Sequence, residues 1–572
     1  MQANARLDAE HRAAAWRKLD GAKLDVLVIG GGVTGAGAAL DAATRGLKVA
    51  LVEARDFASG TSSRSSKLFH GGLRYLEQLN VGLVREALAE RELMLTRIAP
   101  HLVKPVPFLY PLTHRLWERP YVAAGLTLYD TMGGGRSVPR HKHYTRTGAR
   151  KLCPALRPDA LTGAIRYFDA QADDARHTLT VARTAAAYGA TVLNSAEVVG
   201  FTHAGERIVG ATIRDVENGK TVTVATQVVI NCTGVWTDDI QSLAGGRGRF
   251  HVRASKGVHI VVARDRINSE VGLILRTEKS VLFVIPWGTH WIIGTTDTDW
   301  ALDLAHPAAS EADIDYLLSH VNMVLTMPLT RDDIQGVYAG LRPLLAGESE
   351  ETSQLSREHA VARPQPGLVS IAGGKYTTYR VMAADAVDAT VADLGRAIPR
   401  SVTAETPLLG AEGYRALKNQ IVSLAGRYGL PVWKMQHLLD RYGSLVHEVL
   451  APALDDVVLL EPVPGAEEYL MAEIRYAITH EAALHIDDML ARRTRASIET
   501  PHRGAASAPA VAELAATLLG WDAERTTAEL DAYLARVEAE HRSQEQRDDQ
   551  AADAERVAAP DTRRLAVGRA LH

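Results

Sequence analysis

The sequence predicts a mixed α/β protein that ends in a separate helical domain, and three features of the chain carry this prediction. Residues 24–53 read as a buried strand, a glycine-rich turn, an alanine-rich helix and a second buried strand. Residues 191–234 and 257–299 contain short apolar runs of strand length between turn residues. From about residue 411 the apolar residues recur with helical spacing. Strands joined by a helix pair in parallel, which favours a layered α/β fold.

The size and composition of the chain fit a soluble protein of several domains. Its 572 residues are enough for two or three domains. Hydrophobic residues make up 46% and charged residues 23%, as in proteins with a large core. The net charge of −4 gives no global sign of nucleic-acid binding. With Cys153 and Cys232 as the only cysteines, the sequence excludes a disulfide framework and fits a reducing compartment.

The N-terminal region contains no signal peptide and no membrane span that the sequence can identify. Residues 1–21 carry charges throughout and lack the apolar core of a secretory signal. The uncharged run 26–40 contains five glycines and is shorter than the roughly 20 apolar residues of a span. We therefore expect a cytoplasmic protein, either free or attached peripherally to the inner face of the cell membrane.

A glycine-rich turn predicts a dinucleotide site. Gly30, Gly32 and Gly35 form the pattern GxGxxG between the first strand and the helix. Gly30 allows the tight turn, Gly32 lets the backbone approach a pyrophosphate, and Gly35 lets the helix pack on the strand. The helix N-terminus then presents free N–H groups to the anion. Glu53 ends the second strand, eighteen residues after Gly35, and is placed to accept hydrogen bonds from ribose hydroxyls.

The order of segments favours a flavin dinucleotide over NAD. An NAD-binding unit usually continues its β-α-β pattern, whereas this chain leaves the nucleotide unit after Glu53. It returns near residues 227–234 and again at the GGK segment 373–375. Such discontinuous assembly is typical of flavoproteins, in which the flavin ring lies between two domains. A second GxGxxG is absent from the sequence, which argues against a separate pyridine-nucleotide site.

Two long segments resemble the signatures of FAD-dependent glycerol-3-phosphate dehydrogenases. They are "VLVIGGGVTGAGAALDAATRGLKVALVEARDFASGTSSRSSKLFHGGLRYLE", which starts at Val26, and "GGKYTTYRVMA", which starts at Gly373. The segments "NCTGVWTDD", "SKGVHIV", "IPWGTHWIIGTTDTD" and "AGLRPL" also resemble family segments, in the expected order. The resemblance runs from about residue 20 to 530 and leaves both ends of the chain unexplained.

The resemblance implies a Rossmann-like FAD-binding domain, an interleaved antiparallel-sheet substrate domain and a C-terminal all-helical cap domain. We expect an N-terminal extension over residues 1–21 and the FAD- and substrate-binding region over residues 22–398. Within this region, the FAD-binding parts are expected at about 22–95, 165–240 and 340–395. The helical domain should cover residues 399–535, and a charged tail residues 536–572. The tail is charged and poor in large apolar side chains, so we expect a solvated helix or disorder there.

The resemblance also implies which residues hold FAD. The loop "SGTSS" should wrap the cofactor with Thr61 and Ser62, because hydroxyls and backbone N–H groups satisfy phosphate and flavin oxygens. Together with the glycine turn and Glu53, the expected FAD contacts are Gly30, Gly32, Gly35, Glu53, Thr61, Ser62, Lys67, Thr233, Gly234, Gly374 and Lys375.

The implied substrate is sn-glycerol 3-phosphate, oxidised at C2 to dihydroxyacetone phosphate by hydride transfer to flavin N5. Its phosphate needs cations from distant parts of the chain, and the matching motifs contain Arg74, Arg342 and Lys375. Lys256 and His259 are expected to line the same cavity or to serve the structure only. Arg342 is also placed to stabilise a developing alkoxide.

Two histidines compete for the role of catalytic base. His70 is the leading candidate to take the hydroxyl proton and His259 is its rival. For each of them the alternative is a histidine that merely packs near the flavin. "HEAALH" resembles a zinc motif, but His480 and His485 are five residues apart and lie on different helix faces. We therefore expect no catalytic metal.

The electron acceptor is the property that the sequence defines least. The resemblance favours a membrane quinone, with an oxygen-using glycerol-3-phosphate oxidase as the alternative. An amino-acid oxidase-like flavoenzyme is a further alternative, and a non-enzymatic flavin-binding protein a more distant one. "HRAAAWRKL", with Trp16 among cations, is either an interfacial membrane segment or a short solvated helix. The amphipathic C-terminal helices serve packing or a homodimer contact.

Overall fold

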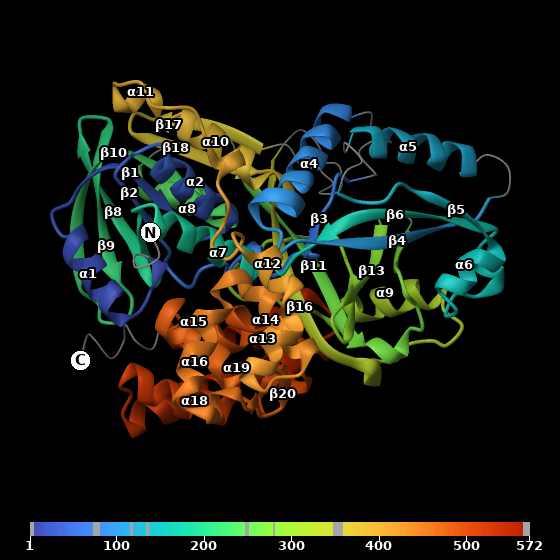
Figure 1. Ribbon diagram of the computed structural model, residues 1–572. Helices are drawn as coiled ribbons and strands as arrows, with labels where there is room; N and C mark the ends of the chain where they lie inside the picture. The colour runs from blue at the N-terminus through green and yellow to red at the C-terminus, as the bar shows by residue number, and fades with distance from the viewer. Residues whose placement is uncertain are drawn as a thin grey trace.

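The structure is a computed structural model that describes residues 5–72, 80–114, 118–132, 137–245, 251–277, 281–346 and 359–563. Two sheets lie side by side in Figure 1, and the C-terminal helices lie beneath them. Segments distant in the sequence build each sheet, so the chain passes repeatedly between them. This confirms the mixed α/β fold with a C-terminal helical domain.

The first sheet has a parallel centre. Its parallel strands, in spatial order, are β18 (Leu368–Gly373), β10 (Thr221–Asn231), β1 (Lys23–Ile29), β2 (Val49–Val52) and β7 (Thr191–Leu193). Antiparallel strands extend it: β17 (His359–Gln365) on β18, β9 (Arg207–Asp215) on β10, and β8 (Ala196–Ala204) on β9. The returns predicted near 227–234 and 373–375 thus end the two strands β10 and β18.

Both faces of the parallel strands are buried, which explains their continuous apolar sequences. Val26 and Val28 of β1 face a cluster shared with α2 (Val33–Thr44), α7 (Asp174–Ala187) and α10 (Tyr379–Asp388). Leu27 and Ile29 face the opposite cluster, which includes α1 (Ala9–Leu19). Gly35 of α2 permits the close helix–strand contact, since a Cβ atom there would lie 1.9 Å from the Gly30 oxygen.

The second sheet is mostly antiparallel. In spatial order its strands are β15 (Thr298–Trp300), β11 (Val252–Ala263), β14 (His290–Gly294), β13 (Val281–Trp287), β12 (Gly272–Arg276), β4 (Lys104–Leu112), β6 (Gly163–Gln171) and β3 (Leu68–Phe69). In addition, β16 (Ile334–Leu345) pairs with β11, and β5 (Lys142–Thr145) pairs with β6. One face packs on α4 (Val81–Leu93) and α5 (Glu118–Met132), and the other on α6 (Arg146–Leu152) and α9 (Glu311–Asn322).

The C-terminal part is helical apart from one small ribbon. A short helix, α11 (Val391–Leu394), precedes it. Its helices are α12 (Tyr414–Asn419), α13 (Ile421–Tyr428), α14 (Val432–Tyr442), α15 (Val446–Leu450), α16 (Met471–His480), α17 (Ala496–Glu499), α18 (Ala508–Leu519), α19 (Ala523–Gln544) and α20 (Asp549–Ala558). Strands β19 (Pro462–Val463) and β20 (Ala466–Leu470) form the ribbon, so the all-helical prediction misses one hairpin.

Both ends of the chain pack more closely than the sequence predicts. The tail expected to start at residue 536 begins inside α19, and α20 buries Ala552 and Arg556. Residues 536–558 are mostly helical, as one of the two predicted alternatives has it, and ion pairs such as Arg556–Glu540 hold the helices partly buried against the rest of the chain. In the N-terminal extension, α1 packs on the first sheet. Trp16 lies partly buried against that core, so it is not presented as a free interfacial anchor.

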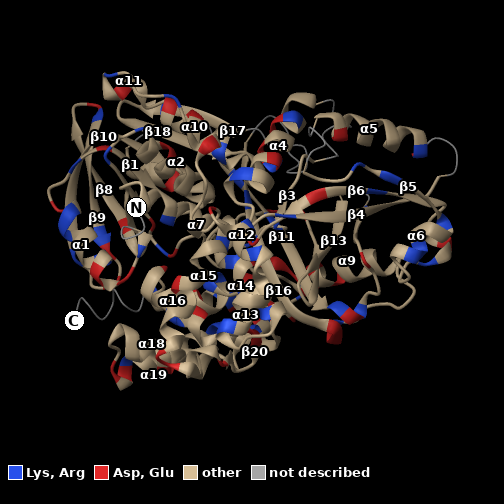
Figure 2. Ribbon diagram, viewed as in Figure 1, with Lys and Arg blue, Asp and Glu red and all other residues tan. Residues whose placement is uncertain are grey.

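The surface carries charges of both signs. Figure 2 shows basic and acidic residues interspersed over the helices and strands in view, in keeping with the net charge of −4. In the described part of the chain, no helix combines the length and apolar character needed to span a membrane.

A buried ion cluster around Asp56 connects the first sheet to the C-terminal helices. Asp56 follows β2 and is fully buried. It accepts hydrogen bonds from Arg492 Nε at 2.6 Å, and from Arg493 NH1 and NH2 at 2.7 and 2.8 Å. Burial alone would raise the pKa of Asp56, but Arg493 and Arg492 hold it well below its usual range. The carboxylate is therefore ionised wherever the protein is folded near neutral pH.

We predict that Asp56→Asn lowers the free energy of unfolding by about 3–5 kcal/mol, because it leaves the buried Arg493 guanidinium without its carboxylate and removes one of the carboxylates that pair with Arg492. Since the folded pKa lies below the unfolded value of about 3.9, the wild-type contribution is complete above that pH. It should disappear as the pH falls below it. Thermal and urea unfolding from pH 3 to 8 measure this. Asp159→Asn, which alters the exposed pair with Arg157, is the matched control. Equal stability of wild type and Asp56→Asn at pH 7 would contradict this role.

Candidate active site

The turn between β1 and α2 forms one end of a large cavity. Gly30 has a φ of +108°, a conformation that side chains with a Cβ atom rarely adopt. Ser62 Oγ accepts a hydrogen bond from the Val33 N–H at 2.9 Å, so the loop 59–63 is attached to the start of α2. A Cβ atom on Gly32 would lie 3.3 Å from Ser62 Oγ. The helix N-terminus and the hydroxyl loop therefore border the same space, where an anionic group is favoured.

Glu53 closes the side of this cavity beside β2. Its Oε2 accepts the Gly31 N–H at 2.6 Å and its Oε1 accepts the Arg55 N–H at 2.7 Å. Burial raises the pKa of Glu53, and the two N–H groups counteract part of that shift. Each carboxylate oxygen has a further lone pair. Because Glu53 lines the cavity, these lone pairs are available to donors of a bound molecule.

The cavity has a volume of about 1190 Å³ and extends from the first sheet to the second. Glu53 and Arg55 line it together with His70, His259 and Arg342. The volume exceeds the roughly 300–1,000 Å³ of ordinary ligand sites. It is thus large enough for a dinucleotide and a small substrate together.

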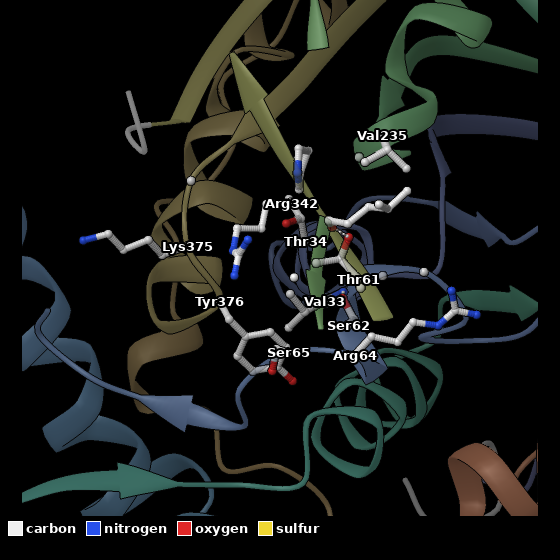
Figure 3. A pocket seen from close by; sticks show the side chains of 18 of the residues that line it. Val33, Thr34, Thr61, Ser62, Arg64, Ser65, Val235, Arg342, Lys375 and Tyr376 are labelled. Atoms are coloured by element: carbon white, nitrogen blue, oxygen red, sulfur yellow. Dashed lines mark hydrogen bonds between the residues drawn. The ribbon is translucent and has the colours of Figure 1, made fainter. Parts of the chain in front are cut away.

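Arg342 projects into the cavity from β16. Figure 3 shows its side chain between the segment that carries Tyr376 and the loop that carries Thr61. Its guanidinium donates to Thr295 Oγ1 at 3.2 Å and to the Thr296 oxygen at 3.3 Å, and it lies 3.4 Å from Asp297 Oδ1. A Cβ atom on Gly257 would lie 2.5 Å from Arg342 NH2, so the glycine makes room for this cation.

The two candidate histidines have different surroundings. The His259 ring stacks on Tyr338, with centroids 4.7 Å apart, and its Nε2 lies 2.9 Å from Ser66 Oγ. Burial lowers the pKa of His259 well below its usual value, and the positive charges of Arg342 and Lys67 lower it further. His70 follows β3, and Thr377 fixes its backbone through hydrogen bonds of 3.1 and 3.3 Å. Both histidines line the cavity.

The GGK segment forms the wall opposite the loop 59–63. Gly373 and Gly374 have φ values of +76° and +80°. A Cβ atom on Gly374 would lie 2.4 Å from Met382 Sδ, so this turn requires glycine. Lys375 lines the cavity, but in Figure 3 its side chain extends away from Arg342. Its charge thus adds to the potential of the wall rather than meeting the Arg342 guanidinium.

Comparison with known proteins identifies the group to which this architecture belongs. Residues 25–380 match the family described as FAD dependent oxidoreductase. Residues 401–526 match the C-terminal domain of alpha-glycerophosphate oxidase. The glycerol-3-phosphate dehydrogenase of Mycobacterium leprae is 63% identical, over 97% of this chain and 95% of its own length. The chain belongs to the FAD-dependent glycerol-3-phosphate dehydrogenase family.

More distant members support the assignment. The mitochondrial glycerol-3-phosphate dehydrogenase of Bos taurus is 37% identical over 89% of this chain and 72% of its own length. The crystal structure of the Bacillus halodurans glycerol-3-phosphate dehydrogenase, complexed with FAD, superposes with a TM-score of 0.75. It is 29% identical and covers 93% of this chain and 97% of that one.

The cofactor of this glycerol-3-phosphate dehydrogenase family member is FAD, and the cavity fits it. The α2 N-terminus and the hydroxyl loop suit a pyrophosphate, and Glu53 offers acceptors to ribose hydroxyls. The cavity then continues between the sheets toward His70 and Arg342, where a flavin ring would lie.

Most residues predicted for the site meet in this one cavity. The lining includes Gly30, Gly32, Glu53, Thr61, Ser62, His70, Thr233, Gly234, His259, Arg342, Gly374 and Lys375. Gly35, the third residue of α2, serves helix–strand packing as predicted, but it is not among the residues that line the cavity, where an FAD contact was expected. Arg74 falls outside the described residues.

Two predicted cations do not line the cavity. Lys256 is fully buried, and its Nζ lies 2.5 Å from Asp313 Oδ2 and pairs with Asp549 of α20. Lys67 is also buried and donates to Asp174 Oδ1 at 2.9 Å and to the Ser63 oxygen at 3.2 Å. For Lys256 this matches the structural alternative, whereas the predicted cofactor contact of Lys67 is wrong, because carboxylates from distant segments bind both ammonium groups. None of these three carboxylates can be paired with its lysine from the local sequence.

Several site residues were not found from the sequence. Ser66 holds His259, Thr295 holds Arg342, and Arg563 from the tail lines the cavity. Only the hydroxyl-rich character of the loop 59–66 gave a local signal.

The zinc-like motif "HEAALH" is not part of this site. Its second histidine, His485, lies between Glu217 and Glu529, and these two carboxylates raise its pKa to about 10 despite burial. The described residues contain no group of side chains that would hold a metal ion.

We predict that FAD affinity falls as the pH is lowered, with a midpoint above the ordinary glutamate pKa of about 4.3. The ionised Glu53 accepts the ribose hydroxyls, and burial raises its pKa, so binding is lost as the carboxyl becomes protonated. Glu53→Gln should bind FAD more weakly and with a flatter pH profile. Flavin fluorescence titration measures both. The exposed variant Glu206→Gln should behave as wild type. A Glu53→Gln profile with the wild-type midpoint would show that another group controls binding.

Proposed function

We propose that this protein oxidises sn-glycerol 3-phosphate to dihydroxyacetone phosphate. The observation that carries the proposal is the position of Arg342, a cation held by hydrogen bonds in the cavity that also contains the dinucleotide site. The names of the relatives that cover nearly the whole chain point to the same reaction. The substrate has a dianionic phosphate and an alcohol at C2, and both need partners within this cavity.

Bound FAD supplies the acceptor for the hydride that leaves C2 of the substrate. The chain supplies the remaining chemistry. The guanidinium of Arg342 binds the anionic substrate and stabilises negative charge on its C2 oxygen as the hydroxyl proton leaves. Lys375 adds positive potential to the neighbouring wall. One hydride and one proton leave the alcohol, which becomes the ketone.

Of the two histidines that line the cavity, we propose His70 as the base. The Nε2 of His259 is engaged with Ser66, and burial together with Arg342 makes its ring a weak base. A general base works best when its pKa lies near the working pH. We therefore assign proton removal to His70, and assign His259 to holding the loop that contains Ser66 beside β11.

The reaction is tested by anaerobic bleaching of the bound flavin. Glycerol 3-phosphate should bleach it completely, whereas glycerol, glycine and sarcosine should not. Bleaching by glycine or sarcosine would instead identify an amino-acid oxidase-like enzyme. A flavin that none of these compounds reduces would indicate a non-enzymatic flavin-binding protein. Glycerol is the informative control, because it has the same C2 alcohol as glycerol 3-phosphate but lacks the dianionic phosphate.

We further propose that a membrane quinone accepts the electrons and that the protein contacts the membrane peripherally. In the C-terminal part, the apolar side chains of Val422, Trp433 and Val457 are 70%, 59% and 72% exposed, which supports such a contact. The alternative acceptor is oxygen, since residues 401–526 match a domain named after an oxidase. Reduction of a soluble quinone analogue and peroxide formation, measured on one preparation, separate the two. A homodimer formed through these helices stays a prediction.

We predict that Arg342→Ala raises the apparent KM for glycerol 3-phosphate and lowers kcat/KM by roughly tenfold to a hundredfold, on the scale of a lost charged hydrogen bond. Gly257→Ala should act in the same direction, because its Cβ would displace Arg342 NH2. Steady-state kinetics with saturating FAD measure both variants. Gly200→Ala, where nothing lies within contact distance of the added Cβ, is the control. Unchanged kinetics in Arg342→Ala would remove its assigned role.

We predict that His70→Asn depresses kcat much more than it raises KM, because the proton loses its acceptor in the transition state. His259→Asn should retain the acid limb of the kcat/KM profile, since burial and the nearby Arg342 lower the pKa of His259 well below its usual value and keep its ring neutral at the working pH. Both profiles are measured by flavin reduction from pH 5 to 9. If His259→Asn loses that limb while His70→Asn keeps wild-type turnover, the two roles must be exchanged.

A further inference from the structure

We propose that the C-terminal segment 549–563 is a strap that closes the FAD cavity at its adenosine end, and that Arg563 contacts the AMP half of FAD. The proposal rests on FAD as the cofactor and is independent of the substrate. The strap includes α20 and the five residues after it, which the family match at residues 401–526 does not cover.

The first end of the strap is anchored at Asp549, the first residue of α20. Its carboxylate pairs with Lys256 Nζ, which is fully buried and also pairs with Asp313. Lys256 is thus shared between a buried carboxylate and the partly exposed carboxylate of Asp549, which fixes the start of α20 beside β11. Three residues further along the helix, Ala552 is fully buried in a small cluster with Val235 and Leu341. Both of these partners line the FAD cavity, so α20 packs on its outer wall.

The second end is attached beside Glu53. Asp561 accepts a hydrogen bond from Arg55 NH2 at 2.7 Å and lies 3.2 Å from His306 Nε2. Hydrogen bonding to His306 and the charge of Arg55 outweigh burial and hold the pKa of Asp561 below its usual range. Arg55 follows Glu53 by two residues, and its N–H binds the Glu53 carboxylate. The strap therefore ends at the part of the cavity that receives the ribose of the AMP half.

Arg563 reaches the cavity itself. Its NH2 donates to both oxygens of Asp488 at 3.0 Å, and its Nε donates to Ser195 Oγ at 3.1 Å. Ser195 in turn donates its N–H to the Arg55 oxygen at 2.7 Å, and Ala196 donates to the Glu53 oxygen at 2.8 Å. The guanidinium is thus fixed against the two segments that border the ribose end. The residue is 6% exposed, yet it lines the cavity.

One nitrogen of Arg563 remains for a ligand. Nε and NH2 are used as described, whereas NH1 has no hydrogen-bond partner within the described part of the chain. An arginine stays protonated at any physiological pH, and its planar group suits phosphate and hydroxyl oxygens. The AMP half of FAD offers both kinds of oxygen. We therefore assign NH1 of Arg563 to this half of the cofactor.

The test compares cofactors that do and do not contain the AMP half. In Arg563→Ala the dissociation constant for FAD should rise roughly tenfold to a hundredfold, the loss expected for one charge-assisted hydrogen bond. The constant for flavin mononucleotide, which lacks AMP, should stay within about twofold on the same scale. ADP, which carries the adenosine without the flavin, should compete with FAD in wild type and much less in the variant. The FAD dissociation constant of Arg563→Lys should lie between those of wild type and Arg563→Ala.

A control and a second variant keep the test decisive. Arg157→Ala removes an exposed ion pair with Asp159, far from the strap in the sequence, and should leave the constants for FAD, flavin mononucleotide and ADP unchanged. If the alanine variant gives no folded protein, Arg563→Gln removes the charge and keeps hydrogen-bonding capacity. Equal weakening of FAD and flavin mononucleotide, or an unchanged FAD constant, would overturn the proposal. Bleaching of the FAD-saturated variant by glycerol 3-phosphate tests the reaction separately, so either proposal can fail alone.

Discussion

The buried carboxylate of Asp56 is the contact on which the arrangement of the three parts depends. It lies three residues after Glu53, so the segment that contains Glu53 also binds Arg492 and Arg493 of the C-terminal helices. Arg492 contacts Asp488, and Asp488 contacts Arg563 of the tail. One chain of alternating charges thus connects the dinucleotide turn, the helical domain and the end of the chain. Because each charge is buried, each depends on its neighbour for compensation.

The two ends of the cavity are lined by different kinds of chemical groups. At one end, the α2 N-terminus, Glu53 and the hydroxyl loop provide the dipole and acceptors that suit a dinucleotide. At the other end, Arg342 is oriented by Thr295 and Asp297 from the second sheet. Neither sheet alone contains both sets of groups. The interleaved order of the chain is therefore what brings the Arg342 guanidinium into the same cavity as the β1–α2 turn.

Local sequence was sufficient for the elements whose chemistry is local. The β1-turn-α2 unit, the positions of Gly30 and Glu53, and the return of the chain at Gly374 follow from spacing and residue type, and the structure has them as predicted. Lys256 and Lys67 were misplaced because their partners, Asp549 and Asp174, are far away in the sequence. The buried partners of the tail were missed for the same reason. Its few apolar residues gave no sign that Asp561 and Arg563 would find buried partners.

The most direct test of the account is a crystal structure of the FAD-loaded protein with glycerol 3-phosphate or dihydroxyacetone phosphate bound. The account predicts the ligand between the flavin and Arg342, with a phosphate or C2 oxygen within hydrogen-bond distance of the guanidinium and C2 facing the flavin ring. A ligand bound elsewhere, or one held in this cavity without any contact to Arg342, would contradict it.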